Sequence, residues 1–150
     1  MFIQVINGPN MNLLGKREPG AYGSEDLAMI NSKLSTLAKE MGAELEAFQS
    51  NHEGELVTKI QELGATKCDG ILINAAAYGH TSIAMRDALK AVAIPFVEVH
   101  MTNVYAREEF RKRSMISDIS SGLVIGFGAD SYLLGLRGLI DKIKRSPREA

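Results

Sequence analysis

The sequence contains no tryptophan and only one cysteine, Cys68, among its 150 residues. A single cysteine excludes an internal disulfide, and we interpret Cys68 as a small structural residue rather than a nucleophile. The three histidines, His52, His80 and His100, lie on separate segments, so metal-ligand spacing is missing as well. We therefore expect neither a disulfide-stabilised scaffold nor a metal site.

Long hydrophobic runs and an excess of one charge are also missing. The formal net charge is −1, which disfavours general electrostatic binding to nucleic acid or to anionic membranes. No apolar run reaches the roughly 18 residues of a membrane span. The first residues, MFIQVINGPN, have no signal-peptide pattern. We expect a cytoplasmic protein with neither nucleic acid nor membrane among its partners.

The chain instead alternates apolar runs with helical patterns. The expected strands are Phe2–Asn7, Glu44–Gln49, Gly70–Asn74, Phe96–His100 and Gly122–Phe127. The expected helices are Ser24–Met41, capped by Ser24, then Glu53–Leu63, Ser82–Val92, a short one near Ala106–Lys112, and Ser131–Lys144. This alternation predicts an α/β, flavodoxin-like three-layer sandwich with a five-stranded parallel sheet in the order 2-1-3-4-5. We expect one catalytic domain over residues 1–150, with a frayed tail from about 145 to 150.

Polar residues follow the first four predicted strands. The four stretches are NGPNMNLLGKREPGAYG, QSNHEGE, NAAAYGHTS and EVHMTNVYAREEFR. In such folds the ligand site lies outside the carboxyl ends of the strands, where these stretches would converge. Burying polar groups without partners is unfavourable, so this convergence indicates a site.

Several known uses of this fold lack their motifs here. The first loop has no Walker or Rossmann glycine pattern. A phosphorelay receiver needs acids and a phosphorylatable aspartate at strand ends, where this chain has Asn7, Asn10 and Asn74. For a flavin nucleotide, Tyr78 alone offers only weak stacking, although a flavodoxin-like nucleotide binder remains an alternative.

Two pairs of residues suit proton transfer. Glu98 and His100 are two residues apart on one strand, so their side chains share a face, and the carboxylate can orient the imidazole as a general acid. The alternative is a structural pair that closes the strand. Tyr22 has a phenol that is a poor base unless a cation such as Arg17 favours the phenolate. The alternative is a tyrosine that packs beneath its loop.

The remaining polar set is neutral or cationic and comprises Asn10, Asn74, His80, Thr102 and Arg111. Such groups suit a polyhydroxylated, anionic small molecule, although asparagines also serve in turns and Arg111 could lie on a solvated helix face. No lysine stands at an apolar strand end, where desolvation would activate it for imine formation. The set therefore indicates proton abstraction beside a carbonyl.

Together the motifs NGPNMNLLGKREPGAYG, FQSNHEGEL, AAAYGHTSIAMRDAL and VEVHMTNVYAREEFR resemble type II 3-dehydroquinate dehydratases. The resemblance covers about residues 3 to 140. It implies a hydro-lyase of the shikimate pathway that converts 3-dehydroquinate to 3-dehydroshikimate by anti elimination through an enolate. It also implies no cofactor or metal, and a homododecamer built as a tetramer of trimers.

The resemblance assigns roles to individual residues. Tyr22 would take the C2 proton with its pKa lowered by Arg17, His100 would protonate the leaving C1 hydroxyl while oriented by Glu98, and Asn10 would hold an enolate-stabilising water. The implied substrate-binding residues are Asn74, the backbone at Met101, Thr102, His80, Arg111 and, from a neighbouring subunit, Asp87. The loop from about Met11 to Tyr22 would act as a lid.

The chain departs from the family pattern at three places. Ala75 replaces the usual proline, Gly79 replaces the usual threonine, and Lys112–Met115 replaces the usual His-His-Ser-Tyr. None of these changes removes a proposed acid, base or enolate stabiliser. A catalytically silent binding protein on the same scaffold is the alternative function.

Overall fold

The computed structural model describes residues 1–16, 20 and 24–146. The strands of its sheet are β1 (Phe2–Asn7), β2 (Glu44–Gln49), β3 (Gly70–Asn74), β4 (Phe96–His100) and β5 (Gly122–Ile125). The α-helices among these residues are α2 (Leu27–Glu40), α3 (Glu53–Leu63), α4 (Ile83–Val92) and α5 (Asp130–Arg145). None of these helices combines the length and the apolarity that crossing a membrane requires.

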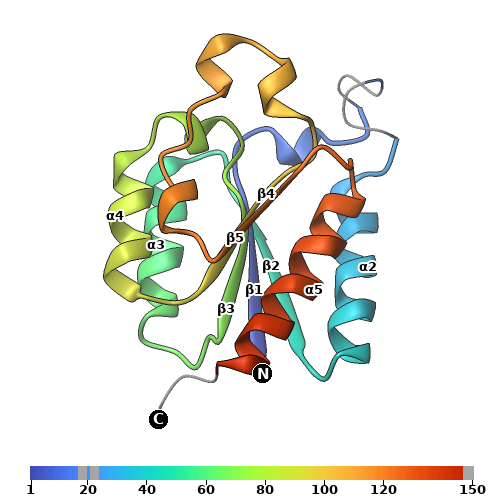
Figure 1. Cartoon of the computed structure of the whole chain (residues 1–150), viewed down its shortest axis with the longest axis vertical. Coiled ribbons are helices and arrows are strands. Elements are labelled where there is room, and N and C mark those ends of the chain that lie inside the picture. Colours follow the sequence, from blue (N-terminus) through green and yellow to red (C-terminus); the bar gives the residue numbers. More distant parts are fainter. Residues whose placement is uncertain (17–19, 21–23, 147–150) are drawn as a thin grey trace.

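The strands form a five-stranded, all-parallel sheet in the order β2-β1-β3-β4-β5, as predicted. Helices α3 and α4 cover one face and α2 and α5 cover the other, which gives the three layers of the flavodoxin-like fold (Figure 1). The register pairs Asn7 with Asn74, so the polar ends of β1 and β3 lie side by side. The sheet thus brings the predicted site residues to one edge.

Each face of the sheet carries its own hydrophobic core. Ile3, Val5, Leu72, Val97 and Val99 pack with α2 and α5, whereas Ile6, Ile71, Ile73 and Phe96 pack with α3 and α4. Strands buried on both faces explain the continuous apolar runs in the sequence. Cys68 belongs to the second core, is 3% exposed and donates its thiol hydrogen to the carbonyl of Gly70, which agrees with a structural role.

Three predicted elements differ from the structure by more than one residue at an end. The first helix begins at Leu27 rather than Ser24, because the carboxylate of Asp26 accepts from the amide of Met29 at 2.9 Å and caps it there. Strand β5 ends at Ile125, because Gly126 adopts a φ of 95° and turns the chain away.

The third difference lies between β4 and β5. Instead of one helix near Ala106–Lys112, the chain forms two 3₁₀ turns, Val104–Ala106 and Glu109–Arg111, followed by a third at Ser117–Ile119. Arg107 is extended, with φ −111° and ψ −159°, and this breaks the helical repeat. The last helix extends through Arg145, and residues 147–150 of the predicted tail lie outside the described residues.

Candidate active site

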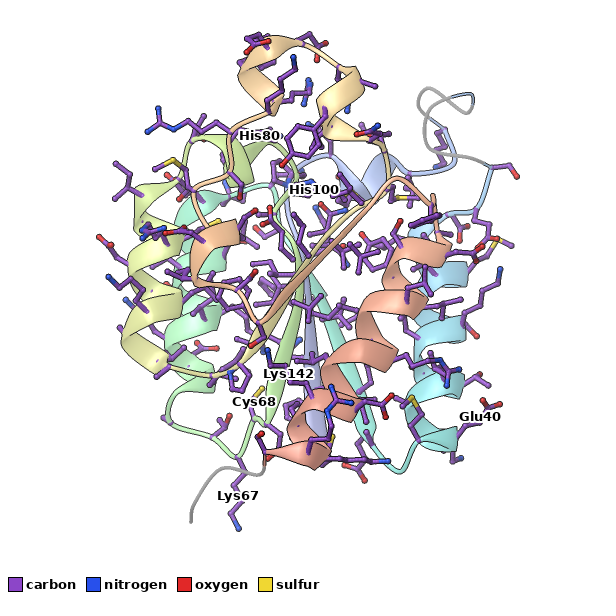
Figure 2. All side chains as sticks on the ribbon, viewed as in Figure 1. Glu40, Lys67, Cys68, His80, His100 and Lys142 are labelled. Atoms are coloured by element: carbon purple, nitrogen blue, oxygen red, sulfur yellow. The ribbon has the colours of Figure 1, made fainter. Side chains whose placement is uncertain are left out.

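A polar cavity of about 140 Å³ lies at the carboxyl ends of β1, β3 and β4. It is lined by Pro9, Asn10, Met11, Asn74, Ala76, Ala77, His80, His100, Met101, Thr102, Val104, Arg107 and Arg111. Figure 2 shows His80 and His100 together near one end of the sheet and Cys68 toward the other. This is the edge at which the sequence predicts a ligand site.

His100 and Glu98 form a buried pair at the end of β4. The imidazole Nε2 lies 2.6 Å from the carboxylate Oε2 of Glu98, and the two side chains are 8% and 0% exposed. Because the carboxylate accepts, Nε2 carries a hydrogen, and Nδ1 is left for proton exchange with a ligand. Burial alone would raise the pKa of the Glu98 carboxyl, but hydrogen bonds from His100, Ser117 and Ser114 outweigh it and lower that pKa.

His80 stacks against His100, with ring centroids 5.8 Å apart. Its Nδ1 lies 2.8 Å from the carbonyl oxygen of Arg113, which can only accept, so Nδ1 carries the hydrogen. Burial lowers the pKa of the His80 imidazole, and the charges of His100 and Arg111 act in the same direction. A neutral His80 therefore presents Nε2 as an acceptor, which suits a ligand hydroxyl.

Two arginines also line the cavity. The guanidinium of Arg107 donates to the hydroxyl of Thr102 at 3.4 Å, and that of Arg111 lies 2.5 Å from the carboxylate of Glu108. A pair of guanidinium groups beside a hydroxyl suits a ligand carboxylate. Arg107 was not among the predicted site residues, although it stands four positions before Arg111 in the same polar stretch.

Asn10 reaches the cavity on a tight turn after β1. Its φ is 68°, a left-handed conformation that asparagine tolerates better than most residues. Its backbone amide donates to the side-chain oxygen of Asn51 at 2.9 Å, which ties the β1 loop to the loop after β2. The turn interpretation and the ligand interpretation of Asn10 are therefore compatible.

Asn74 is only 4% exposed and belongs to a buried network. Its amide donates to the hydroxyl of Tyr132 at 2.9 Å, and this hydroxyl donates to the side-chain oxygen of Asn7 at 2.6 Å. Burial raises the pKa of the Tyr132 phenol, so the phenol stays protonated. The sequence did not indicate a role for Tyr132 near the site, because its position on a helix predicts only a core residue.

Replacing Tyr132 by phenylalanine is expected to lower the free energy of unfolding by about 1–3 kcal/mol, because buried groups of Asn7 and Asn74 lose their partner. Urea unfolding measures the change. Tyr105→Phe is the control, since Tyr105 is 53% exposed and its loss should cost less than about 0.5 kcal/mol. Equal midpoints for the two variants would contradict the prediction.

Two predicted site residues, Tyr22 and Arg17, lie outside the described residues. Asp87 is exposed on α4 and is not among the lining residues. Within the described part of the chain, no cluster of three His, Cys, Asp or Glu side chains could hold a metal ion.

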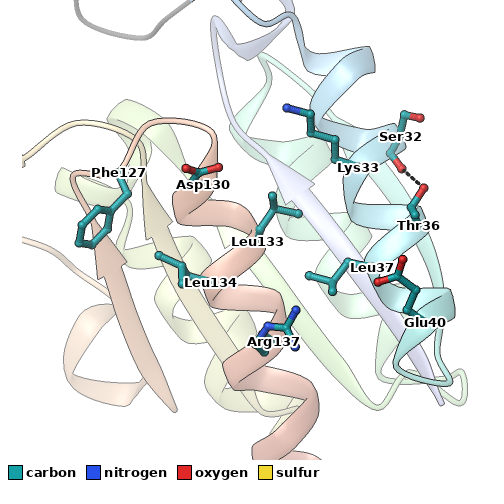
Figure 3. A pocket seen from close by; sticks show the side chains of 10 residues that line it. All are labelled: Ser32, Lys33, Thr36, Leu37, Glu40, Phe127, Asp130, Leu133, Leu134 and Arg137. Atoms are coloured by element: carbon teal, nitrogen blue, oxygen red, sulfur yellow. Dashed lines mark hydrogen bonds between the residues drawn. The ribbon is translucent and has the colours of Figure 1, made fainter.

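A larger hollow of about 580 Å³ lies between α2 and α5, away from these groups (Figure 3). It is lined by Ser32, Lys33, Thr36, Leu37, Glu40, Phe127, Asp130, Leu133, Leu134 and Arg137. It offers no imidazole, and of its lining residues only Phe127 comes from a loop that follows a strand. The smaller cavity is therefore the candidate active site, since its polar groups converge from several strands.

Comparisons with known proteins identify the family of this chain. The model of the family described as "Dehydroquinase class II" matches residues 1–140. A 3-dehydroquinate dehydratase of Prochlorococcus marinus (strain NATL1A) is 59% identical over 145 residues, which cover 97% of this chain and 99% of that protein. Another, from Bordetella avium (strain 197N), is 59% identical over 135 residues, or 90% of this chain and 94% of that protein.

The structural comparison leads to the same family. The crystal structure of a type II dehydroquinase from Butyrivibrio crossotus DSM 2876 is similar with a TM-score of 0.90 and 44% identity, over 93% of this chain and 97% of that one. The resemblance seen in the sequence, and with it the expected hydro-lyase class, is confirmed. The chain belongs to the class II dehydroquinase family.

Proposed function

We propose that this chain dehydrates 3-dehydroquinate to 3-dehydroshikimate in the shikimate pathway. The single observation that carries the proposal is the buried Glu98–His100 pair beside a cavity that also presents Arg107 and Arg111. A general acid next to guanidinium groups suits the loss of water from a hydroxylated carboxylate. The family relationship narrows this chemistry to dehydroquinate.

The base of the proposed reaction is the Tyr22 phenolate, with its pKa lowered by Arg17. The phenolate takes the proton from C2, and the electron pair moves onto the neighbouring carbonyl to give an enolate. A water held by Asn10 stabilises the enolate oxygen. Both Tyr22 and Arg17 lie outside the described residues, so their roles rest on the family motif and on the chemistry of a phenol beside a guanidinium group.

The acid of the proposed reaction is protonated His100. As the enolate collapses, the C1–O bond breaks and the imidazolium gives its proton to the leaving hydroxyl, which departs as water. Tyr22 then loses the proton that it has taken, and His100 regains the proton that it has given, by exchange with solvent. Glu98 remains a carboxylate throughout, and by accepting from Nε2 it keeps the His100 ring oriented for this transfer.

The substrate contacts follow from the donors and acceptors of the cavity. Asn74, Thr102 and the backbone at Met101 would hold the carboxylate and the nearby hydroxyl. Arg111 would donate to the ring hydroxyls, while the neutral His80 accepts from one of them. Arg107 joins this set, because its guanidinium lies beside the Thr102 hydroxyl.

We further propose that the chain assembles as a homododecamer, a tetramer of trimers, and that it acts in the cytoplasm as a single domain. Asp87 would then reach the cavity of a neighbouring subunit. Its exposure on α4 is compatible with that role. The lid from about Met11 to Tyr22 is part of the same proposal.

The test is turnover of 3-dehydroquinate by purified protein after treatment with a chelator and, separately, after treatment with borohydride in the presence of substrate, followed by removal of both reagents. Formation of the conjugated enone is expected to raise the ultraviolet absorbance in both treated samples, because the proposed mechanism uses neither a metal nor an imine. Heat-denatured protein is the control. A folded, assembled sample without turnover would contradict the proposal and favour the silent binding protein.

A further inference from the structure

The acid half of the cavity depends on a segment that no predicted role includes. Residues Arg113–Asp118 follow the polar stretch after β4 and lie against Glu98. The carbonyl of Arg113 accepts from His80 at 2.8 Å. The hydroxyls of Ser114 and Ser117 both donate to the Glu98 carboxylate.

The direction of the Ser114 hydrogen bond follows from its partners. The hydroxyl oxygen of Ser114 accepts from the backbone amides of Ile116 at 3.2 Å and Ser117 at 3.1 Å. A hydroxyl has two lone pairs and one hydrogen, so only the hydrogen remains for Glu98. It points at both carboxylate oxygens, at 3.1 Å and 2.9 Å. Ser114 is thus a fixed donor, which favours the ionised form of Glu98.

The Arg113–Asp118 segment is itself held from α4. One guanidinium nitrogen of Arg86 donates to the carbonyl of Met115 at 2.9 Å, and both terminal nitrogens bind the Asp118 carboxylate at 2.5 and 3.0 Å. The amide of Met115 also donates to the carbonyl of Gly79 at 2.8 Å. These contacts leave the two serines little freedom to turn away from Glu98.

We propose that Ser114 and Ser117 are positioning residues that act through Glu98 to keep His100 oriented and ready to donate its proton. The proposal deepens the proposed function and rests on it. Three donors, the two serines and His100, surround a carboxylate that is 0% exposed and has no water access. Without the two serine donors, burial would favour the protonated form of the Glu98 carboxyl, which lacks the charge that holds the Nε2 hydrogen and orients His100. Among the described residues, the ionisable groups that face this carboxylate are His100 and His80, whose ring stacks on the ring of His100.

Ser117→Ala is the sharper of the two possible variants, because the hydroxyl of Ser114 also holds the local backbone. Loss of one hydrogen bond to a charged group is expected to reduce kcat about 10- to 100-fold, with KM nearly unchanged. Ser117→Thr keeps the hydroxyl and should restore kcat. Ser120→Ala is the matched control. It also removes one hydroxyl from this turn, but the Ser120 hydroxyl donates to the carbonyl of Ser117 and not to Glu98.

A second readout requires no turnover. Infrared spectroscopy follows the stretching band of a protonated buried carboxyl, and the part of the band absent in Glu98→Gln belongs to Glu98. In Ser117→Ala this band is expected to appear at a higher pH than in the unchanged protein, in Ser117→Thr or in Ser120→Ala. The infrared measurement therefore stays informative even if dehydroquinate is not the substrate.

The kinetic and infrared results together distinguish the positioning role of the serines from the proposed dehydratase function. An unchanged kcat in Ser117→Ala, or a band that appears at the same pH in all variants, would overturn the positioning role. A rise in KM without a fall in kcat would also overturn it, since that pattern belongs to a substrate contact. Absence of turnover in the unchanged protein, together with the expected infrared displacement, would instead contradict only the proposed function.

Discussion

Replacing His100 by asparagine is expected to lower kcat about 100- to 10,000-fold, because the leaving hydroxyl then departs without a proton donor. Asparagine fits the space, and although its amide overlaps Nδ1 rather than Nε2, the Glu98 carboxylate keeps the hydroxyls of Ser114 and Ser117 as donors. The fold and the affinity for substrate should therefore change little. Steady-state turnover and thermal unfolding measure the two effects.

The same variant distinguishes the acid from the base. In deuterated water, His100→Asn should still exchange the C2 hydrogen of 3-dehydroquinate, since Tyr22 remains to form the enolate. Tyr22→Phe should lose both exchange and dehydration. Proton NMR of the substrate follows both. Loss of exchange in His100→Asn, or its survival in Tyr22→Phe, would contradict the assigned roles.

A second large effect is expected from Gly8→Ala. A Cβ atom at this position would lie 2.3 Å from the carbonyl oxygen and 2.6 Å from the carbonyl carbon of Ala75. Both are backbone atoms, and the amide of Gly8 also donates to the carbonyl of Asn74 at 2.8 Å, so neither strand end can move without losing the other. We expect a loss of at least about 3 kcal/mol in the free energy of unfolding, or failure to fold.

Gly54→Ala is the matched control, because the same substitution in α3 meets no atom within 4 Å. It replaces a glycine by a better helix former and should be neutral or stabilising by up to about 1 kcal/mol. Urea unfolding of both variants gives the comparison. Equal unfolding midpoints for Gly8→Ala and Gly54→Ala would contradict the close contact between Gly8 and the carbonyl of Ala75.

The sheet could be predicted from the sequence because its strands are continuous apolar runs, and the order of elements leaves few topologies. The Glu98–His100 contact was also predictable, since two residues on one strand share a face. Asn10, Asn74, His80, Thr102 and Arg111 could be assigned to one edge because each ends or follows a strand. Met101 was implied only by the family resemblance, and all six residues line the cavity.

The partners of these residues could not be predicted in the same way. Tyr132 contacts Asn7 across 125 positions of sequence, and its helical spacing indicates only burial. Ser114 and Ser117 stand in an irregular segment, where no period of 2 or 3.6 tells which way a side chain points. The helix expected near Ala106–Lys112 was wrong because Arg107 adopts an extended conformation that its neighbours in sequence do not require.

The connection between β4 and β5 has a consequence for how the protein opens. The backbone amides of Met115, Ile116, Ser117 and Ser121 all donate to partners within the fold, and Ile116 is 1% exposed. Opening this connection would expose Ile116 and would at the same time remove the hydroxyls of Ser114 and Ser117 from Glu98. These four amides should therefore exchange with solvent as slowly as those of a strand. The arrangement of Glu98 and His100 should be disrupted only when the core itself unfolds.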